Sequence, residues 1–254
     1  MRPAARDFNA LFREHVFGNH DIFTARSYAD FIRRNDIDLA RAVTVVERGA
    51  TIAALAFGLR AERAWFGLIG VHPSHRRGGI GKRIFTQAID EVRMLGVRSI
   101  ELEVSQRNAP TLRMCESLGF ESAGELLVWA RGAQPGASAL TMRRRSERTV
   151  GAIVRSPAAC WQREPRSIAL ANGSALIEVP GAYAFVRIDG DFANVLDAGA
   201  SDAASARELV REFGARVPQD VTLNNEPSDS VLTAALRESD WRVVERQYRL
   251  LRSG

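Results

Sequence analysis

The chain has 254 residues, of which 46% are hydrophobic and 26% are charged, a composition typical of a folded globular protein. The length is ample for two domains of ordinary size. No apolar run is long enough to cross a membrane, and the N-terminal residues carry charges where a signal peptide would have an apolar core. We therefore expect a cytoplasmic protein with no membrane partner.

The formal net charge of +5 would suit a nucleic-acid-binding protein. However, Lys82 is the only lysine, and the arginines are spread along the whole chain rather than gathered into one basic stretch. We therefore expect nucleic acid not to be the main partner. The cysteines Cys115 and Cys160 suit a reducing compartment, and no spacing of cysteine and histidine indicates a metal site.

Hydrophobic periodicity predicts two helices at the start of the chain, followed by three strands, a helix, a strand, a helix and a strand. Ser27 is a candidate N-cap for the second helix. The predicted helices span Ala5–His20, Tyr28–Ile32, Lys82–Leu95 and Ala109–Leu118, and the predicted strands span Val43–Glu47, Ile52–Leu59, Ala64–Val71, Ile100–Val104 and Leu126–Ala130.

A second series of elements follows the loop-like stretch GAQPGAS at residues 132–138. Its predicted strands span Ser174–Val179, Tyr183–Ile188, Phe192–Leu196, Val221–Leu223 and Val243–Leu251, and its predicted helices span Ala203–Phe213 and Ser228–Ser239. Aligning Trp241 with Phe120 brings the ends of the two series into register, which indicates a divergent internal duplication. We expect an α/β protein with a mixed sheet and two tandem copies, with domains at 1–131 and 151–254 and a linker at 132–150.

A glycine-dense turn follows the predicted strand Ala64–Val71 and opens the next helix. Backbone N–H groups at a helix start lack intrahelical partners, and with the helix dipole they form an anion site that glycines let a phosphate approach closely. A Walker A loop is excluded because Arg83 stands where it needs serine or threonine. A dinucleotide fingerprint is excluded because Ile84 replaces its third glycine.

The remaining pattern, R-x-x-G-x-G from Arg76 to Gly81, resembles the pyrophosphate loop of the GNAT superfamily of acyl-CoA-dependent N-acyltransferases. The likeness continues through Leu102-Glu103-Val104, Asn108-Ala109-Pro110 and Glu116-Ser117-Leu118-Gly119-Phe120. It implies a GNAT-like fold and acetyl-CoA as co-substrate. The length resembles that of bacterial tandem-GNAT proteins, in which one half keeps the cofactor site and the other half is degenerate.

The resemblance also implies how the cofactor is held. Three main-chain groups would pair with the pantetheine arm as an added strand would, a run of N–H groups would hold the pyrophosphate, and two cationic side chains would add positive charge. The implied cofactor-binding residues are Ile69, Gly70, Val71, Arg76, Arg77, Gly78, Gly79, Ile80, Gly81, Lys82 and Asn108. The alternatives are that the glycines only make a tight turn, that the arginines form a solvated face, and that Asn108 is a helix N-cap.

Acetyl transfer to an amine needs a base, a donor for the oxyanion and a proton for the departing thiolate. Glu103 is the candidate base, acting directly or through a water, with Glu101 and His72 as alternatives. The N–H of Val71 is the candidate oxyanion donor. The tyrosine acid of the family falls on Cys115, which either protonates the thiolate or only packs as a small buried residue.

The second half lacks these features. Asp197–Asp202, with one glycine and flanking acids, stands where a glycine-rich loop belongs, and Glu103 aligns with Asn224. We expect an N-acetyltransferase that moves an acetyl group from acetyl-CoA to a primary amine by direct attack on the thioester, without a metal, as a monomer or homodimer. The alternatives are a non-catalytic acyl-CoA-binding or scaffold protein and an arginine-rich nucleic-acid binder. The acceptor amine and the acyl chain length stay open.

Overall fold

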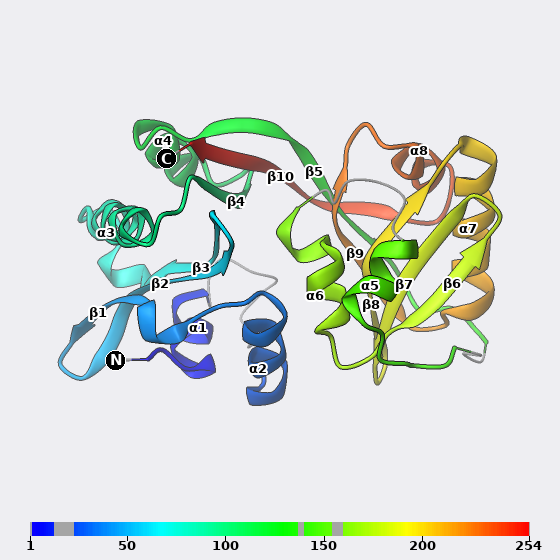
Figure 1. Ribbon diagram of the computed structural model, residues 1–254, viewed down its shortest axis with the longest axis horizontal. Helices are drawn as coiled ribbons and strands as arrows, with labels where there is room; N and C mark the ends of the chain where they lie inside the picture. The colour runs from blue at the N-terminus through cyan, green and yellow to red at the C-terminus, as the bar shows by residue number, and fades with distance from the viewer. Residues whose placement is uncertain (1, 13–22, 137–139, 154–159, 254) are drawn as a thin grey trace. The chain divides into compact units, whose positions relative to one another are not determined.

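Figure 1 shows the computed structural model of the protein, which describes residues 2–12, 23–136, 140–153 and 160–253. Packing divides the chain into two units. The first unit comprises Met1–Val104, Asn108–Ala123 and Leu250–Gly254, and the second comprises Ser105–Arg107 and Gly124–Arg249. The sequence-based boundaries at 131 and 151 stay a prediction, because the packing units follow strand pairing rather than the order of the chain.

The described residues of the first unit include the α-helices α1 to α4 and the strands β1 to β4. Their bounds are α1 Ala5–Phe12, α2 Ala25–Arg34, β1 Val43–Glu47, β2 Ala50–Arg60, β3 Arg63–Val71, α3 Ile80–Met94, β4 Ser99–Ser105 and α4 Ala109–Ser117. The predicted elements are present with shifted ends. Residues 13–20 of the first predicted helix lie outside the described residues. Ser27 is not the N-cap of α2; Thr24 is, and Ser27 completes the capping box.

The second half of the chain repeats, over residues 175–253, the order found over residues 43–131: three strands, a helix, a strand, a helix and a strand. Its bounds are α5 Glu147–Ile153, α6 Pro165–Ala169, β6 Ala175–Val179, β7 Ala182–Asp189, β8 Phe192–Ala200, α7 Ala203–Arg216, β9 Asp220–Pro227, α8 Val231–Arg237 and β10 Arg242–Ser253. Part of the expected linker is helical, since α5 begins within it and Val150 is fully buried. The predicted strand that began at Phe192 is longer than expected and includes Asp197.

Strand β5, Glu121–Arg131, leaves the first unit and pairs antiparallel with β9 of the second. Strand β10 begins in the second unit, and its last residues, from Leu250, belong to the first unit. There the Arg252 Nε donates to the carbonyl oxygen of Leu118 at 2.7 Å. Each unit therefore contains a strand end from the other half of the sequence.

Apolar side chains of the central helix cover the sheet in each unit. In the first, Phe85 of α3 packs against Phe66 and Phe120, with ring centroids 5.9 and 6.4 Å apart. In the second, Phe213 of α7 packs against Trp241 at 5.5 Å. The helical spacing read from the sequence is thus the spacing of the buried faces. No helix in the described ranges is long and apolar enough to cross a membrane.

Strand β3 is bulged where it leaves its parallel neighbour. It pairs with β4 only over Arg63–Trp65. Two residues later, Gly67 has no partner in β2, so β3 has one extra residue at this point. A bulge bends a strand and increases its twist, and here it accompanies the separation of β3 from β4.

The bulge needs a glycine because the Trp65 indole lies over it. A Cβ added to Gly67 would meet the ring of Trp65 at 2.0 Å. We expect Gly67→Ala to lower the free energy of unfolding by about 1–3 kcal/mol, the usual cost of overpacking. Gly132→Ala is the control, because its Cβ would meet nothing closer than 3.9 Å, and its change should stay within about 0.5 kcal/mol. Urea unfolding of the two variants checks this, and equal stabilities would contradict the account.

Candidate functional site

The predicted pyrophosphate loop connects β3 to α3 through a tight turn. A short 3-10 helix, Pro73–His75, follows the strand. Arg77 and Gly79 then both adopt the left-handed conformation, with φ of 66° and 76°. Arg77, Gly78 and Gly79 are all exposed. The turn thus presents its main chain to solvent directly before the first residue of the helix.

The N-terminus of α3 is open. Gly79 is its N-cap, and no side chain in the described part of the chain caps it. The first intrahelical bond runs from Arg83 N to Gly79 O at 3.1 Å, so the N–H groups of the first turn have no helical acceptor. Together with the helix dipole, these groups can hold an anion.

The start of α3 lies against the end of β3 and against α4. A Cβ at Gly81 would stand 3.7 Å from both the Val71 Cγ2 and the Met114 Sδ, which is ordinary contact. Gly81 therefore faces neighbouring side chains of the protein, whereas a Cβ at Gly79 would meet nothing within 4 Å. Of the two glycines, Gly79 is the one beside open space.

The two cations proposed to assist the loop differ in position. Arg76 turns back to the strand, where its Nε donates to the Val71 carbonyl oxygen at 3.0 Å and its Nη2 to that of Leu11 at 3.5 Å. Lys82 is exposed in the first turn of α3. Arg76 thus holds the end of β3 and the first helix together, and Lys82 is the cation on the helix surface.

The carboxylate of Glu103 is fixed by a buried tryptophan. The Trp65 Nε1 donates to the Glu103 Oε2 at 2.8 Å, and the Trp65 side chain is almost fully buried. Phe31 of α2 packs on the same indole, with ring centroids 5.9 Å apart. Glu101 has a different partner, since its Oε1 lies 3.4 Å from the Nη1 of Arg63. The Trp65 indole thus binds Glu103, and the Arg63 guanidinium lies beside Glu101.

The two remaining residues on α4 have clear structural roles. Asn108 is the N-cap, and its Oδ1 accepts from Thr111 N at 3.2 Å. Cys115 is fully buried, and this burial raises the pKa of its thiol to about 12. The thiol therefore stays protonated through the neutral range, inside the core.

His72 belongs to a short polar chain at the end of β3. Its Nδ1 lies 2.8 Å from the Ser74 hydroxyl, which lies 2.8 Å from the His75 Nδ1. The His75 Nε2 in turn lies 3.1 Å from the Glu47 Oε2. The described residues contain no group of three or more side chains that could hold a metal ion.

Trp65 and Gly67 were missed as site residues by the sequence analysis. A glycine within a strand pattern indicates a bulge or a close approach of another group. Gly67, inside the predicted strand Ala64–Val71, gave this signal. Nothing in the sequence indicated the contact between Trp65 and Glu103, which are 38 residues apart.

The corresponding helix start in the second unit is closed by its own chain. The N-cap of α7 is Asp202, whose carboxylate accepts from Ser205 N at 2.9 Å. These hydrogen bonds lower the pKa of Asp202. The expectation that Asp197 flanks a loop was wrong: Asp197 lies in β8 and is buried, because the strand continues to Ala200.

Part of the chain is similar in sequence to known acetyltransferases. Residues 8–120 match the model of the acetyltransferase (GNAT) family. A 55-residue segment is 40% identical to the [ribosomal protein bS18]-alanine N-acetyltransferase of Escherichia coli, over 22% of this chain and 37% of that protein. The chain thus spans little more than a third of that relative.

Two solved structures share the fold over nearly the whole chain. A GCN5-related N-acetyltransferase from Sphaerobacter thermophilus has a TM-score of 0.67 at 16% identity, covering 98% of this chain and 91% of that one. Eis1 from Mycobacterium abscessus has a TM-score of 0.54 at 19% identity, covering 98% and 70%. The chain therefore has the α/β fold of these acetyltransferase structures, and its residues 8–120 match the model of the acetyltransferase (GNAT) family.

Proposed function

We propose that this protein is an N-acetyltransferase that binds acetyl-CoA in its first unit and transfers the acetyl group to a primary amine. The observation that carries the proposal is the uncapped start of α3 at the end of a strand whose parallel pairing has already stopped. The two features supply, side by side, N–H groups for a pyrophosphate and an unpaired strand edge for a pantetheine arm.

In this proposal the strand edge is provided by Ile69, Gly70 and Val71. These residues pair with β2 on one side, and on the other side the ladder with β4 ends at Trp65. Backbone groups that point away from β2 are then available to the amide groups of pantetheine, apart from the Val71 carbonyl oxygen, which accepts from the Arg76 Nε. The N–H of Val71, at the end of the strand, is the proposed donor to the oxyanion of the tetrahedral intermediate.

Glu103 is the proposed base. An alkylammonium has a reference pKa near 10.4, so the acceptor must lose a proton before it attacks the thioester carbon. The amine nitrogen then forms the new C–N bond, and the C–S bond breaks to release CoA. The Trp65 indole fixes one oxygen of the Glu103 carboxylate and so sets where that carboxylate points.

The second unit is proposed to be a degenerate copy. Its element order repeats that of the first unit, but the Asp202 carboxylate already occupies the anion position at the start of α7. A pyrophosphate would have to displace this like-charged group. One acetyl-CoA per chain is therefore expected.

The direct test is release of CoA thiol from acetyl-CoA in the presence of a broad amine panel. The panel includes polyamines, amino acids, aminoglycosides and peptides with N-terminal alanine, the last because of the E. coli relative. Acetyl-CoA binding without turnover on any amine would favour the alternative of a non-catalytic acyl-CoA-binding protein.

The loop has a matched pair of glycines for testing cofactor binding. Gly79 and Gly49 have φ of 76° and 82°, and a Cβ at either would meet nothing within 4 Å. Alanine at each costs about 1–2 kcal/mol of left-handed strain. We expect only Gly79→Ala to weaken acetyl-CoA binding, by about tenfold or more, because its Cβ projects into the proposed pyrophosphate site. Calorimetry measures both, and equal affinities would remove the loop from the site.

The base is tested by Glu103→Gln, which should lower kcat/KM by about a hundredfold with little change in the Kd of acetyl-CoA. Trp65→Phe should have a smaller effect and move the acid limb of the rate–pH profile to higher pH, since it removes a donor to the ionised carboxylate. The control is Trp129→Phe, a buried tryptophan of the second unit, which should leave the profile in place. A Glu103→Gln rate near that of the parent would transfer the role to Glu101 or His72.

Cys115 is expected to have a packing role. Because burial raises the pKa of its thiol to about 12, native Cys115 should react with a disulfide reagent roughly a thousandfold more slowly than an ordinary exposed thiol. Cys115→Ala should keep kcat within about twofold and lower stability by about 1 kcal/mol. A tenfold loss of kcat at unchanged acetyl-CoA affinity would instead show that the thiol protonates the leaving group.

A further inference from the structure

The second unit contains a strand pair built like the one at the proposed cofactor site. Strands β8 and β9 pair in parallel over Phe192–Val195 and then stop. Leu196 is the extra residue in β8, as Gly67 is in β3. Counted from the bulge, Ala198 holds the position in β8 that Ile69 holds in β3. The second unit thus has the same separation of two parallel strands, with Ala198 at the position that corresponds to Ile69.

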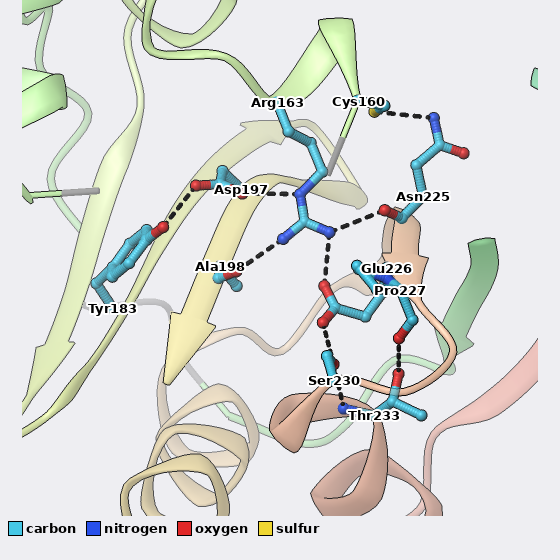
Figure 2. Close-up of polar contacts among 10 residues, drawn as sticks. All are labelled: Cys160, Arg163, Tyr183, Asp197, Ala198, Asn225, Glu226, Pro227, Ser230 and Thr233. Carbon is cyan, nitrogen blue, oxygen red and sulfur yellow. Dashed lines mark hydrogen bonds and ion pairs between the residues drawn. The ribbon is translucent and has the colours of Figure 1, made fainter. Parts of the chain in front are cut away.

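An arginine side chain lies between these strands, as Figure 2 shows. The Nη2 of Arg163 donates to the Ala198 carbonyl oxygen at 2.7 Å, and its Nη1 donates to the Asn225 carbonyl oxygen at 3.0 Å. Ala198 is in β8 and Asn225 is in β9, both beyond the end of their ladder. The guanidinium therefore joins two main chains that no longer bind one another.

Two carboxylates complete the surroundings of the guanidinium. The Nε lies 2.7 Å from the Asp197 Oδ1, and the Nη1 lies 2.6 Å from the Glu226 Oε2. The three side chains are only 5%, 4% and 3% exposed. Burial raises the pKa of both carboxyl groups, and the charge of Arg163 acts in the opposite direction. A planar group with five donors can meet four acceptors at once, which a lysine ammonium cannot.

Each carboxylate is also held from the side away from the arginine. The Tyr183 hydroxyl donates to the Asp197 Oδ2 at 2.8 Å, and the Ser230 hydroxyl donates to the Glu226 Oε1 (Figure 2). A cavity of about 100 Å³ remains beside the cluster, and Gly199 and Pro227 are among its lining residues. The acceptors are therefore pre-positioned around the place that the guanidinium takes.

The segment that carries Arg163 is anchored to the same unit. Trp161 is fully buried, and its carbonyl oxygen accepts from the Ser167 hydroxyl at 2.9 Å. The Asn225 Nδ2 donates to the Gln162 Oε1 at 2.8 Å. Both the backbone that carries Arg163 and the carboxylates that bind its guanidinium are thus held in place by hydrogen bonds.

We propose that the second unit keeps a binding site whose ligand is a guanidinium, and that the chain supplies this ligand itself as Arg163. The side chain binds the carbonyl oxygen of Ala198, the strand position that corresponds to Ile69 in the first unit, and in that correspondence the inference rests on the proposed function. The site is filled from within, so acetyl-CoA does not enter it.

Replacement of the tethered ligand by a free one tests the proposal. Arg163→Ala leaves two buried carboxylates without their cation and should lower Tm by roughly 10 °C. Ethylguanidinium is the fragment that this substitution removes, and at millimolar concentration it should raise the Tm of Arg163→Ala by several degrees through mass action. Ethylammonium should not. Arg211→Ala is the control, because Arg211 is 72% exposed and its ion pair is with its helix neighbour Glu208.

Several results would overturn the proposal. These are an unchanged Tm for Arg163→Ala, an equal response to ethylammonium, or an equal response of Arg211→Ala to ethylguanidinium. If Arg163→Ala does not fold without the additive, refolding yield with and without ethylguanidinium gives the same comparison. Arg163→Lys should also lose Tm, because one ammonium cannot join both strands and both carboxylates.

Stoichiometry separates this inference from the proposed function. Titration of the wild-type protein with acetyl-CoA should give one site per chain, and two equal sites would overturn the inference. No binding at all would contradict the proposed function, while the response to ethylguanidinium would still decide the role of Arg163.

Discussion

In each unit, two parallel strands pair for a few residues and then separate. A buried backbone group without a partner is costly, so a strand edge freed in this way must be satisfied by something else. In the second unit the Arg163 guanidinium satisfies it, through the carbonyl oxygens of Ala198 and Asn225. In the first unit the proposed partner is the pantetheine arm of a cofactor. Under the proposed function, the same strand geometry serves a cofactor site in one unit and an internal arginine in the other.

The helix that follows the separated strand also differs between the units, in whether a side chain of the protein caps its start. The first turn of α3 begins at an exposed glycine and has no side-chain cap among the described residues. The first turn of α7 receives the Asp202 carboxylate of its own chain. One helix start is free to hold an external anion, and the other holds an internal one. Under the proposed function, side chains of the protein itself take the places in the second unit that the cofactor takes in the first.

The order of the elements and the glycine turn could be predicted from local signals. The apolar spacing of α3 and the position of Gly79 depend on neighbours within a few residues, which periodicity and turn propensity describe well. The contacts that define the sites are not local: Trp65 reaches Glu103, and Arg163 reaches Asp197 and Glu226, across 38, 34 and 63 residues. Asp197 was misassigned to a loop because the segment Asp197–Asp202 consists of small and polar residues, which are also typical of turns. Such features depend on strand pairing, which composition does not encode.

The assignment of strand ends to the two units has a consequence for the order of events during synthesis. Protein chains emerge from the ribosome N-terminus first, and domains generally fold as units while this happens. The first unit includes Leu250–Ser253, where Arg252 binds the carbonyl oxygen of Leu118. It therefore cannot reach its final packing until residue 252 has left the ribosomal tunnel, by which time the whole of β6 to β9 is already available. Synthesis of Gly124–Arg249 therefore separates the two parts of the chain that the first unit needs.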